Sequence, residues 1–410
     1  MNSHSPRSSR SGERAPTKLP VVIVAGLHEG ARRSAVRDLL TTHPDAVVLH
    51  HDLTRAEERT VRRTVSGVNG PLAPSVDTAL VNDCPCCAVR EDLVPELWRI
   101  ARGGRHSLAV IELWGGSDIH PVTEVIAGTE PAEGCLDELV EVSQVVTAVE
   151  PLRLIRELSI PDTLREHALH TAPDDETTLA EALAHQIEYA GLLAVPSHSP
   201  DNDEERRDLE TALAMLGQLQ PAAPIAAIGT GEVSTYALTG FDVAAARDRV
   251  DPTIPLLPQN ADASGVRTLM WERRAPLHPG RLYEALHQLV PAAHRSRGRF
   301  WLANRPDTML AWDAAGANLT VEDCGPWLAA LTDTQWDLYP PARRVAAALD
   351  WDPQHGDRIQ RLSFTAPDLE AESITELLDS CLATDDEPAA GSADWQRLPD
   401  AFADLLSPLA

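Results

Sequence analysis

The sequence predicts an α/β fold, with a mostly parallel sheet covered by helices on both faces, followed by a smaller α+β domain. The first observation is a set of short runs, at 19–25, 107–113 and 143–149, that are apolar throughout, as expected of strands buried on both faces. The second is that helical patterns, at 31–40 and 88–102, alternate with such runs, which is the order of βαβ units. The third is a change of character after residue 264, where strand-like and helical segments mix and seven of the nine tryptophans follow residue 270.

The remaining elements follow from the same patterns. In the first part of the chain, we expect strands at 46–50, 78–82, 191–195 and 224–228, a helix at 179–189, and a charged connector at 200–207 that precedes another helix. In the second part, we expect strands at 268–273, 299–304, 309–313, 318–322 and 358–365, with helices at 279–289 and 374–382. The predicted organisation is a flexible polar tail at 1–18, a first domain at 19–250, a Pro/Asp/Asn-rich linker at 251–264, and a second domain at 265–410.

The charge of the chain limits its partners and its chemistry. The formal net charge is −27, so the folded body repels nucleic-acid phosphates and no direct nucleic-acid binding is expected of it. Locally basic segments are the tail and residues 32–37 and 59–63, both of which we expect to be helical. Lys18, in the tail, is the only lysine. A phosphate-binding Gly-Lys-Ser/Thr lysine, a base-reading lysine and a Schiff-base lysine are therefore excluded from the folded body.

No apolar run approaches the length of a membrane span, and the first 18 residues are too polar for a secretory signal. There are six cysteines, and three of them lie within four residues, a spacing that suits metal or redox chemistry better than disulfides. We therefore expect a cytoplasmic protein with no membrane partner.

The first candidate site is the strand–turn–helix segment 21–34, which has the geometry of a phosphate-binding loop. Counted from Gly26, the positions that require Gly, Lys and Ser/Thr hold Ala31, Arg32 and Arg33. Two interpretations stay open. The segment is a βα turn that has kept only the shape, or it retains residual nucleotide binding. The residues that would then contact the nucleotide are Gly26, Gly30, Arg32, Arg33, Ser34, Glu112 and Gly115.

The second candidate is the segment 83–92, in which Cys84, Cys86 and Cys87 precede a helix. A helix N-terminus favours thiolate, and three thiolates suit Zn²⁺ or Cu(I) with the fourth tetrahedral position left open. A redox pair of Cys84 with Cys87, or three small buried cysteines without a ligand, are the alternatives. The side chains that could complete a metal site are His28, Glu29, His50, His51 and Glu112.

A weaker third candidate is Glu112, which ends a predicted strand and is followed by the glycine pair Gly115 and Gly116. Nucleotide hydrolases keep a Mg²⁺-binding or switch group at such a strand end. Taken alone, this pattern has little specificity.

The order of these segments resembles the CobW family of metal-handling GTPases, over roughly residues 19–400. That family has a Gly-Cys-x-Cys-Cys motif between its phosphate loop and a Glu-Thr-x-Gly segment, and the counterparts here are residues 83–87 and 112–115. Further matches are 185–190, before the strand that precedes the base-reading motif, and, in the second domain, 274–282, 297–306 and 356–360.

The departures from the family pattern fall in the nucleotide motifs. The phosphate loop lacks Gly-Lys-Thr, and Pro196, Ser197, His198 and Ser199 replace the Asn-Lys-x-Asp that reads guanine. An intact cysteine motif with eroded GTPase motifs resembles the actinobacterial branch that recruits a ribosome hibernation factor. The resemblance implies a zinc-responsive recruitment factor with weak or absent GTP hydrolysis and no catalytic residue. The alternative that it implies is a zinc metallochaperone that hydrolyses GTP and delivers metal to a client protein.

Overall fold

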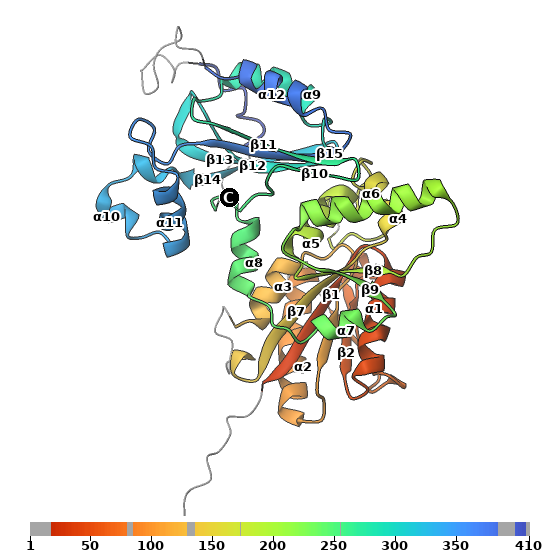
Figure 1. Ribbon diagram of the computed structural model, residues 1–410. Helices are drawn as coiled ribbons and strands as arrows, with labels where there is room; N and C mark the ends of the chain where they lie inside the picture. Colours follow the sequence, from red (N-terminus) through yellow and green to blue (C-terminus); the bar gives the residue numbers. More distant parts are fainter. Residues whose placement is uncertain are drawn as a thin grey trace, which may run out of the picture.

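Two β-sheets, one in each half of the chain, organise the structure (Figure 1). The computed structural model describes residues 18–79, 85–128, 136–172, 174–254, 256–383 and 398–406, with the backbone alone at 85–88 and at 90. The first sheet lies low in Figure 1 and the second lies above it, with the helices α5 (Leu179–Tyr189) and α6 (Asp203–Leu219) between them.

The first sheet has the strand order β4-β3-β2-β6-β1-β7-β8-β9, with β5 paired to β3. The run from β2 to β9 is parallel, and β3, β4 and β5 form an antiparallel edge. On β1, Val21 and Ile23 belong to one buried cluster and Val22 and Val24 to another, which explains why the strand is apolar throughout. The strands are β1 (Leu19–Ala25), β2 (Val47–Asp52), β3 (Thr60–Gly67), β4 (Gly70–Pro71), β5 (Val76–Ala79), β6 (Ala109–Glu112), β7 (Val140–Ala148), β8 (Leu192–Pro196) and β9 (Ile225–Ile228).

Helices cover both faces of this sheet. The helices α1 and α7 contribute to the cluster on the face of Val22 and Val24, and α2, α3 and α5 contribute to the cluster on the face of Val21 and Ile23. In the described residues, no helix is both long enough and apolar enough to traverse a bilayer. The remaining helices of this half are α1 (Glu29–Thr42), α2 (Pro85–Gly103), α3 (Ile119–Ile126), α4 (Pro151–Glu157), α7 (Glu232–Tyr236) and α8 (Val243–Val250).

The second sheet is antiparallel, with the order β10-β11-β15-β12-β13-β14. One face is covered by α9 and α12, whose Leu282, Leu289, Ile374 and Leu378 are buried in the same cluster as Trp312. The other face packs against α5 and α6. The elements are β10 (Ala261–Ala263), β11 (Val266–Arg273), α9 (Pro279–Leu289), β12 (Arg295–Leu302), β13 (Arg305–Ala315), β14 (Asn318–Pro326), α10 (Asp333–Trp336), α11 (Pro341–Leu349), β15 (Gln360–Pro367) and α12 (Ala371–Ser380).

The predicted fold class is confirmed, with several corrections to single elements. The segment 59–63 is not a helix, because Thr60–Gly67 forms β3 and pairs with β2, burying Val61 and Val65 on one side. The connector 200–207 is shorter than expected, since the Asn202 side chain caps α6 and the helix begins at Asp203. The strand β10 lies inside the range expected to be a linker. The helix after the cysteine segment begins at Pro85 rather than at residue 88.

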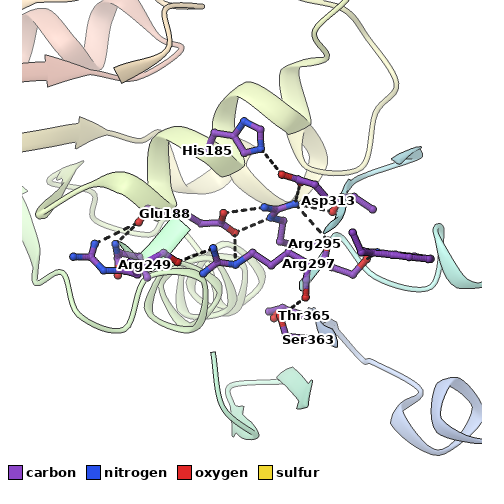
Figure 2. A network of polar contacts seen from close by, with 12 residues as sticks. His185, Glu188, Arg249, Arg295, Arg297, Asp313, Ser363 and Thr365 are labelled. Carbon is purple, nitrogen blue, oxygen red and sulfur yellow. Dashed lines mark hydrogen bonds and ion pairs between the residues drawn. The ribbon is translucent and has the colours of Figure 1, made fainter. Parts of the chain in front are cut away.

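A buried ion network joins the two domains (Figure 2). Glu188 of α5 is 2% exposed, and its carboxylate accepts hydrogen bonds from Nε and Nη2 of Arg295 at 2.7 and 2.8 Å. Arg297 lies 3.4 Å from the same carboxylate, and Arg295 also pairs with Asp313 of β13. His185, one turn before Glu188, contacts Asp313 at 3.0 Å. Three buried charged groups, Glu188, Arg295 and Arg297, and the partly exposed Asp313 thus satisfy one another across the two domains, which fixes α5 against β12 and β13.

Removing the carboxylate of Glu188 should therefore destabilise the protein strongly. Burial favours the neutral acid, but the charges of Arg295 and Arg297 outweigh it and lower the pKa of Glu188 below its ordinary 4.5. We expect Glu188→Ala to reduce the free energy of unfolding by about 3–5 kcal/mol at neutral pH, since two buried guanidinium groups lose their partner. Urea denaturation followed by tryptophan fluorescence measures the difference.

The control for this prediction is Glu210→Ala, which removes an exposed partner of Arg206 and should change the unfolding free energy by less than about 0.5 kcal/mol. The Glu188 contribution is complete above about pH 4.5 and is lost as the pH falls through the lowered pKa of the folded state. A wild-type advantage over Glu188→Ala that persisted unchanged in strong acid would contradict this assignment.

Candidate functional site

The turn between β1 and α1 is too short to wrap a phosphate. Gly26 leaves β1 with φ of 135°, and a Cβ on it would lie 2.1 Å from the carbonyl oxygen of Ala148 on β7, so only glycine fits. Helix α1 already begins at Glu29, and the backbone N–H of Arg32 bonds the carbonyl of His28 at 3.1 Å. Only residues 26–28 remain as a loop. A phosphate cradle needs the following residues in loop form, with their N–H groups directed at the anion, and here those residues are helical.

The guanidinium of Arg32 fills the space inside this turn. Its Nη1 donates to the carbonyl oxygens of Gly26 at 2.5 Å and Leu27 at 3.0 Å, and the residue is 2% exposed. Its Nε lies 3.9 Å from Oε1 of Glu112, at the end of β6. Burial lowers the pKa of the Arg32 guanidinium, although the charges of Glu112 and Glu29 oppose the shift. Arg32 therefore bonds the protein's own backbone at the position where a phosphate-binding lysine would reach toward a nucleotide.

The side chain of Leu169 packs against Gly115, next to Arg32. A Cβ on Gly115 would lie 2.9 Å from Cδ2 of Leu169, 2.9 Å from the carbonyl oxygen of Leu27 and 3.2 Å from Nη1 of Arg32. A Cβ built on the next glycine, Gly116, would lie 2.2 Å from the Leu169 carbonyl oxygen. Trp114 fastens the same segment by donating its indole N–H to Leu169 at 2.9 Å. The segment between α4 and α5 is thus packed directly onto the turn, and Leu169 closes the space beside Arg32.

Three of the predicted nucleotide contacts point elsewhere. Gly30, Arg33 and Ser34 lie on the solvent side of the first turns of α1: nothing lies within 4 Å of a Cβ built on Gly30, and Arg33 is paired with Glu29 at 2.5 Å on an exposed surface. The hydroxyl of Ser34 donates to the Gly30 carbonyl within the helix. The structure therefore brings together Gly26, Arg32, Glu112 and Gly115 of the predicted set, and leaves the other three outside.

A buried acid lies beside the N-terminus of α1. His28, the N-cap residue, contacts the Glu157 carboxylate of α4 at 3.0 Å, and Glu157 also pairs with Arg153 at 2.9 Å. Glu157 is 4% exposed. A negative group of the chain itself thus lies near the helix end that would otherwise attract an anion.

The place of the base-reading motif, after β8, also holds internal contacts. The hydroxyl of Ser197 donates to the carbonyl of Ile228 at 2.9 Å, and His198 contacts Glu205 at 2.9 Å. A carboxylate that could accept both N–H groups of a guanine edge is missing from residues 196–199, as the sequence indicated.

The cysteine segment lies at the start of α2. Cys84 is outside the described residues, whereas Cys86 and Cys87 lie in the first turn of the helix that begins at Pro85, where only the backbone is described. Since the positive end of the helix dipole favours thiolate over thiol, this position suits metal-binding cysteines. Among the residues whose side chains are described, no group of three metal-ligating side chains occurs. The proposed metal set therefore depends on the cysteines themselves.

Ion pairs fasten α2 to the edge of the first sheet. Asp92, in the second turn of α2, accepts from His51 of β2 at 2.9 Å and from Arg63 of β3 at 2.8 Å. Burial favours the neutral acid, but the hydrogen bond from His51 and the charge of Arg63 outweigh it and lower the pKa of Asp92. The same contacts engage Nε2 of His51, and His28 is engaged with Glu157, so both histidines already have carboxylate partners.

A cavity of about 340 Å³ lies between the ends of β2 and β6 and the helices α2 and α3. Its walls are mainly apolar, and its acidic groups are Glu112 and Asp118. Apolar walls and carboxylates do not suit a triphosphate, so this cavity does not replace the missing phosphate site. The lining residues are His51, Leu53, Val89, Leu93, Glu112, Leu113, Trp114, Ser117, Asp118, Pro121, Val122, Val125 and Thr171.

The fold is that of a nucleotide-binding α/β domain joined to an antiparallel-sheet domain, and comparison with known proteins agrees. Residues 47–226 match the CobW/HypB/UreG nucleotide-binding domain, and residues 266–382 match the cobalamin synthesis protein cobW C-terminal domain. The first match begins at β2, after the altered turn. The chain belongs to the CobW family.

Two relatives show the extent of the similarity. The zinc chaperone Rv0106 of Mycobacterium tuberculosis is 30% identical over 401 residues, covering 94% of this chain and 93% of its own. The zinc-regulated GTPase metalloprotein activator 1 of Dictyostelium discoideum is 24% identical over 361 residues, covering 85% of this chain and 72% of its own. The crystal structure of the Zn(II)-bound YjiA GTPase from E. coli is 11% identical, with a TM-score of 0.35, covering 90% of this chain and all of its own.

The sequence patterns do not identify two residues that lie against the turn in space but are distant from it in sequence. Leu169 and Glu157 come from the region between β7 and α5, where no motif marks them. Asp92 belongs to the cysteine segment 83–92, but its contact with Arg63 depends on β3 being a strand.

If Arg32 is a structural group, replacing it should destabilise the protein in the absence of any ligand. We expect Arg32→Ala to lower the free energy of unfolding by about 2–4 kcal/mol, because Glu112 loses its buried counter-charge and two carbonyls lose a donor. The neighbouring exposed variant Arg33→Ala should change it by less than about 0.5 kcal/mol. Parallel urea denaturation of the three proteins is the measurement, and an Arg32→Ala protein as stable as wild type would show that the guanidinium is held for a ligand instead.

Proposed function

We propose that this protein is a zinc-responsive recruitment factor of the CobW family, in which the cysteine site and not nucleotide hydrolysis controls the binding of a partner protein. The observation that carries the proposal is the filled turn after β1, where Arg32 bonds the carbonyls of Gly26 and Leu27 and Leu169 lies against Gly115. GTP and Mg²⁺ would have to displace both side chains, and Arg33 supplies no hydroxyl to hold the metal. Hydrolysis is therefore expected to be weak or absent.

Zinc is the metal that the donor set supports. Cys84, Cys86 and Cys87 would supply three thiolates, and a tetrahedral zinc ion would keep a fourth position for a further ligand. Binding releases thiol protons, so the affinity should rise with pH in the neutral range. The names of the two relatives, a zinc chaperone and a zinc-regulated GTPase activator, support the same metal.

The partner is proposed from the family resemblance and from charge. A cytoplasmic recruitment factor with a net charge of −27 would contact protein surfaces rather than ribosomal RNA. Within the CobW family, an intact cysteine motif with an eroded nucleotide site resembles the branch that recruits a ribosome hibernation factor under zinc limitation. We therefore propose such a factor as the recruited protein.

A second function, zinc delivery to a client protein, is favoured by the name of the relative that is 30% identical, a zinc chaperone. In that case, zinc would pass from the three cysteines to the client, and the open fourth position would admit the client's ligand. The two functions differ in the zinc state that binds the partner: recruitment under zinc limitation requires the zinc-free protein, and delivery requires the zinc-loaded protein.

Affinity capture from zinc-starved and zinc-replete cells distinguishes the two functions. The baits are wild type and a variant with Cys84, Cys86 and Cys87 all changed to Ser, which should lose tight zinc binding in a chelator-competition titration. Recruitment predicts that wild type captures a ribosome-associated factor only under starvation, and that the variant captures it under both conditions because it imitates the zinc-free state.

Delivery predicts the opposite pattern in the same assay. Wild type would then capture a zinc-dependent enzyme under replete conditions, and the variant would capture it under neither. An unchanged zinc stoichiometry in the Ser variant would contradict both functions, since it would place the metal elsewhere.

A further inference from the structure

The helical pair α10–α11 exposes large apolar side chains in the second domain. Of the large apolar residues in the described chain, Leu338 and Leu349 are the most exposed, at 82% and 77%, and Val345 and Trp351 follow in the same segment at 59% and 50%. We refer to these four residues as the α10–α11 patch. Figure 1 shows the two helices beside β14, projecting from the second domain away from the first sheet.

Helix α11 buries small apolar side chains and exposes larger ones, which is the reverse of what packing onto a core favours. Its buried side carries the small Ala346 and Ala347, while the larger Val345 and Leu349, one turn apart, face solvent. Burying the larger pair would remove more apolar area from water, so hydrophobic packing alone does not explain this orientation. Large apolar side chains gathered on one exposed segment in this way indicate an interaction site.

Polar contacts hold the helix in this orientation. Arg343 is 6% exposed, and its guanidinium donates to the carbonyls of Thr253 at 3.4 Å and Pro326 at 3.1 Å and contacts the Met309 sulfur at 3.0 Å. Rotating α11 to bury Val345 and Leu349 would break all three contacts of the Arg343 guanidinium. The patch is therefore a fixed feature of the folded domain.

The ends of the two helices are also pre-organised. Trp351 packs edge-on against Trp336 with ring centroids 5.7 Å apart, and the Trp336 indole N–H donates to the Leu328 carbonyl at 2.6 Å. Arg344 pairs with Asp337 at 3.1 Å, which ties the segment after α10 to α11. A half-exposed tryptophan held in one position loses little side-chain entropy on binding and is the residue type that most often anchors an interface.

Acidic groups border the patch and identify the chemistry of its partner. Asp333 and Asp337 are exposed in this segment, with Asp337 paired to Arg344 at 3.1 Å, whereas Asp352 already contacts Nδ1 of His355 at 3.0 Å. The net charge of −27 disfavours a second copy of the chain on the same surface. Apolar side chains flanked by acids match an amphipathic helix with an apolar face and basic flanks.

We propose that the α10–α11 patch is the docking surface for a basic amphipathic helix of a partner protein. This inference rests on the proposed function, because it gives the recruited or served protein a binding surface separate from the cysteine segment. The apolar face of the partner helix lies on Leu338, Val345 and Leu349, Trp351 supplies the anchor, and its basic residues face the aspartates.

The test uses a fluorescent synthetic helix of leucine and lysine, with a leucine and glutamate helix of the same pattern as the charge control. Anisotropy titration of full-length wild type should show saturable binding of the leucine–lysine helix and none of the control. The double variant Leu338→Ser/Leu349→Ser should bind at least about tenfold more weakly. Leu238→Ser, at a 48% exposed leucine after α7, is the matched control and should bind like wild type.

Three outcomes of these measurements on the purified protein would overturn the inference. They are equal binding by the double variant and wild type, equal binding of both synthetic helices, and a wild-type dimer in sedimentation velocity that the double variant abolishes, which would make a second copy the occupant. Thermal unfolding and zinc stoichiometry of the double variant check that it remains folded. Partner capture in cells by the double variant at the wild-type level would refute this surface while leaving the zinc-gated function intact, so the two failures are distinguishable.

Discussion

The hydrogen bonds from Arg32 to the carbonyls of Gly26 and Leu27 are the interaction on which the functional interpretation depends. A phosphate loop works because backbone N–H groups are left free to face an anion. In this protein, the turn presents carbonyl oxygens to a guanidinium, so the polarity of the site is inverted: a cation of the chain occupies it, and its counter-charge is Glu112 at 3.9 Å. Leu169 packs against Gly115 beside this buried cation, so the segment between α4 and α5 lies directly against the turn.

The rest of the family architecture remains in place around this filled turn. The network of Glu188, Arg295, Arg297 and Asp313 fixes the two domains against each other, and Asp92 fixes α2 and its cysteine-bearing first turn against β2 and β3. Both sets of contacts are independent of the turn after β1. The helix that bears Cys86 and Cys87 and the second domain are therefore held in place by contacts that do not involve this turn.

The sequence predicted the parts of this structure that local patterns determine. The uniform apolar run 19–25 indicated β1, the Thr178 capping box agrees with the predicted start of α5, and the missing Gly-Lys-Ser/Thr indicated that Arg32 and Arg33 would not act as a usual phosphate loop. Where the Arg32 guanidinium goes could not be predicted, because its position depends on α1 beginning at Glu29 and on Leu169, which is distant in sequence. The helix predicted for the basic run 59–63 is wrong for a similar reason, since pairing with β2 and β5 makes this run part of a strand.

We propose that the cysteine site acts without a nucleotide, and the reciprocity of coupled binding tests this directly. If GTP·Mg²⁺ bound and were coupled to the metal site, it would change the zinc affinity by the same factor by which zinc changes the nucleotide affinity. The measurement is a chelator-competition titration of zinc on the full-length protein, with and without saturating GTP·Mg²⁺. We expect the same zinc dissociation constant in both titrations, within about twofold; a shift of tenfold or more, equal to about 1.4 kcal/mol of coupling, would show that a nucleotide acts on the cysteine site.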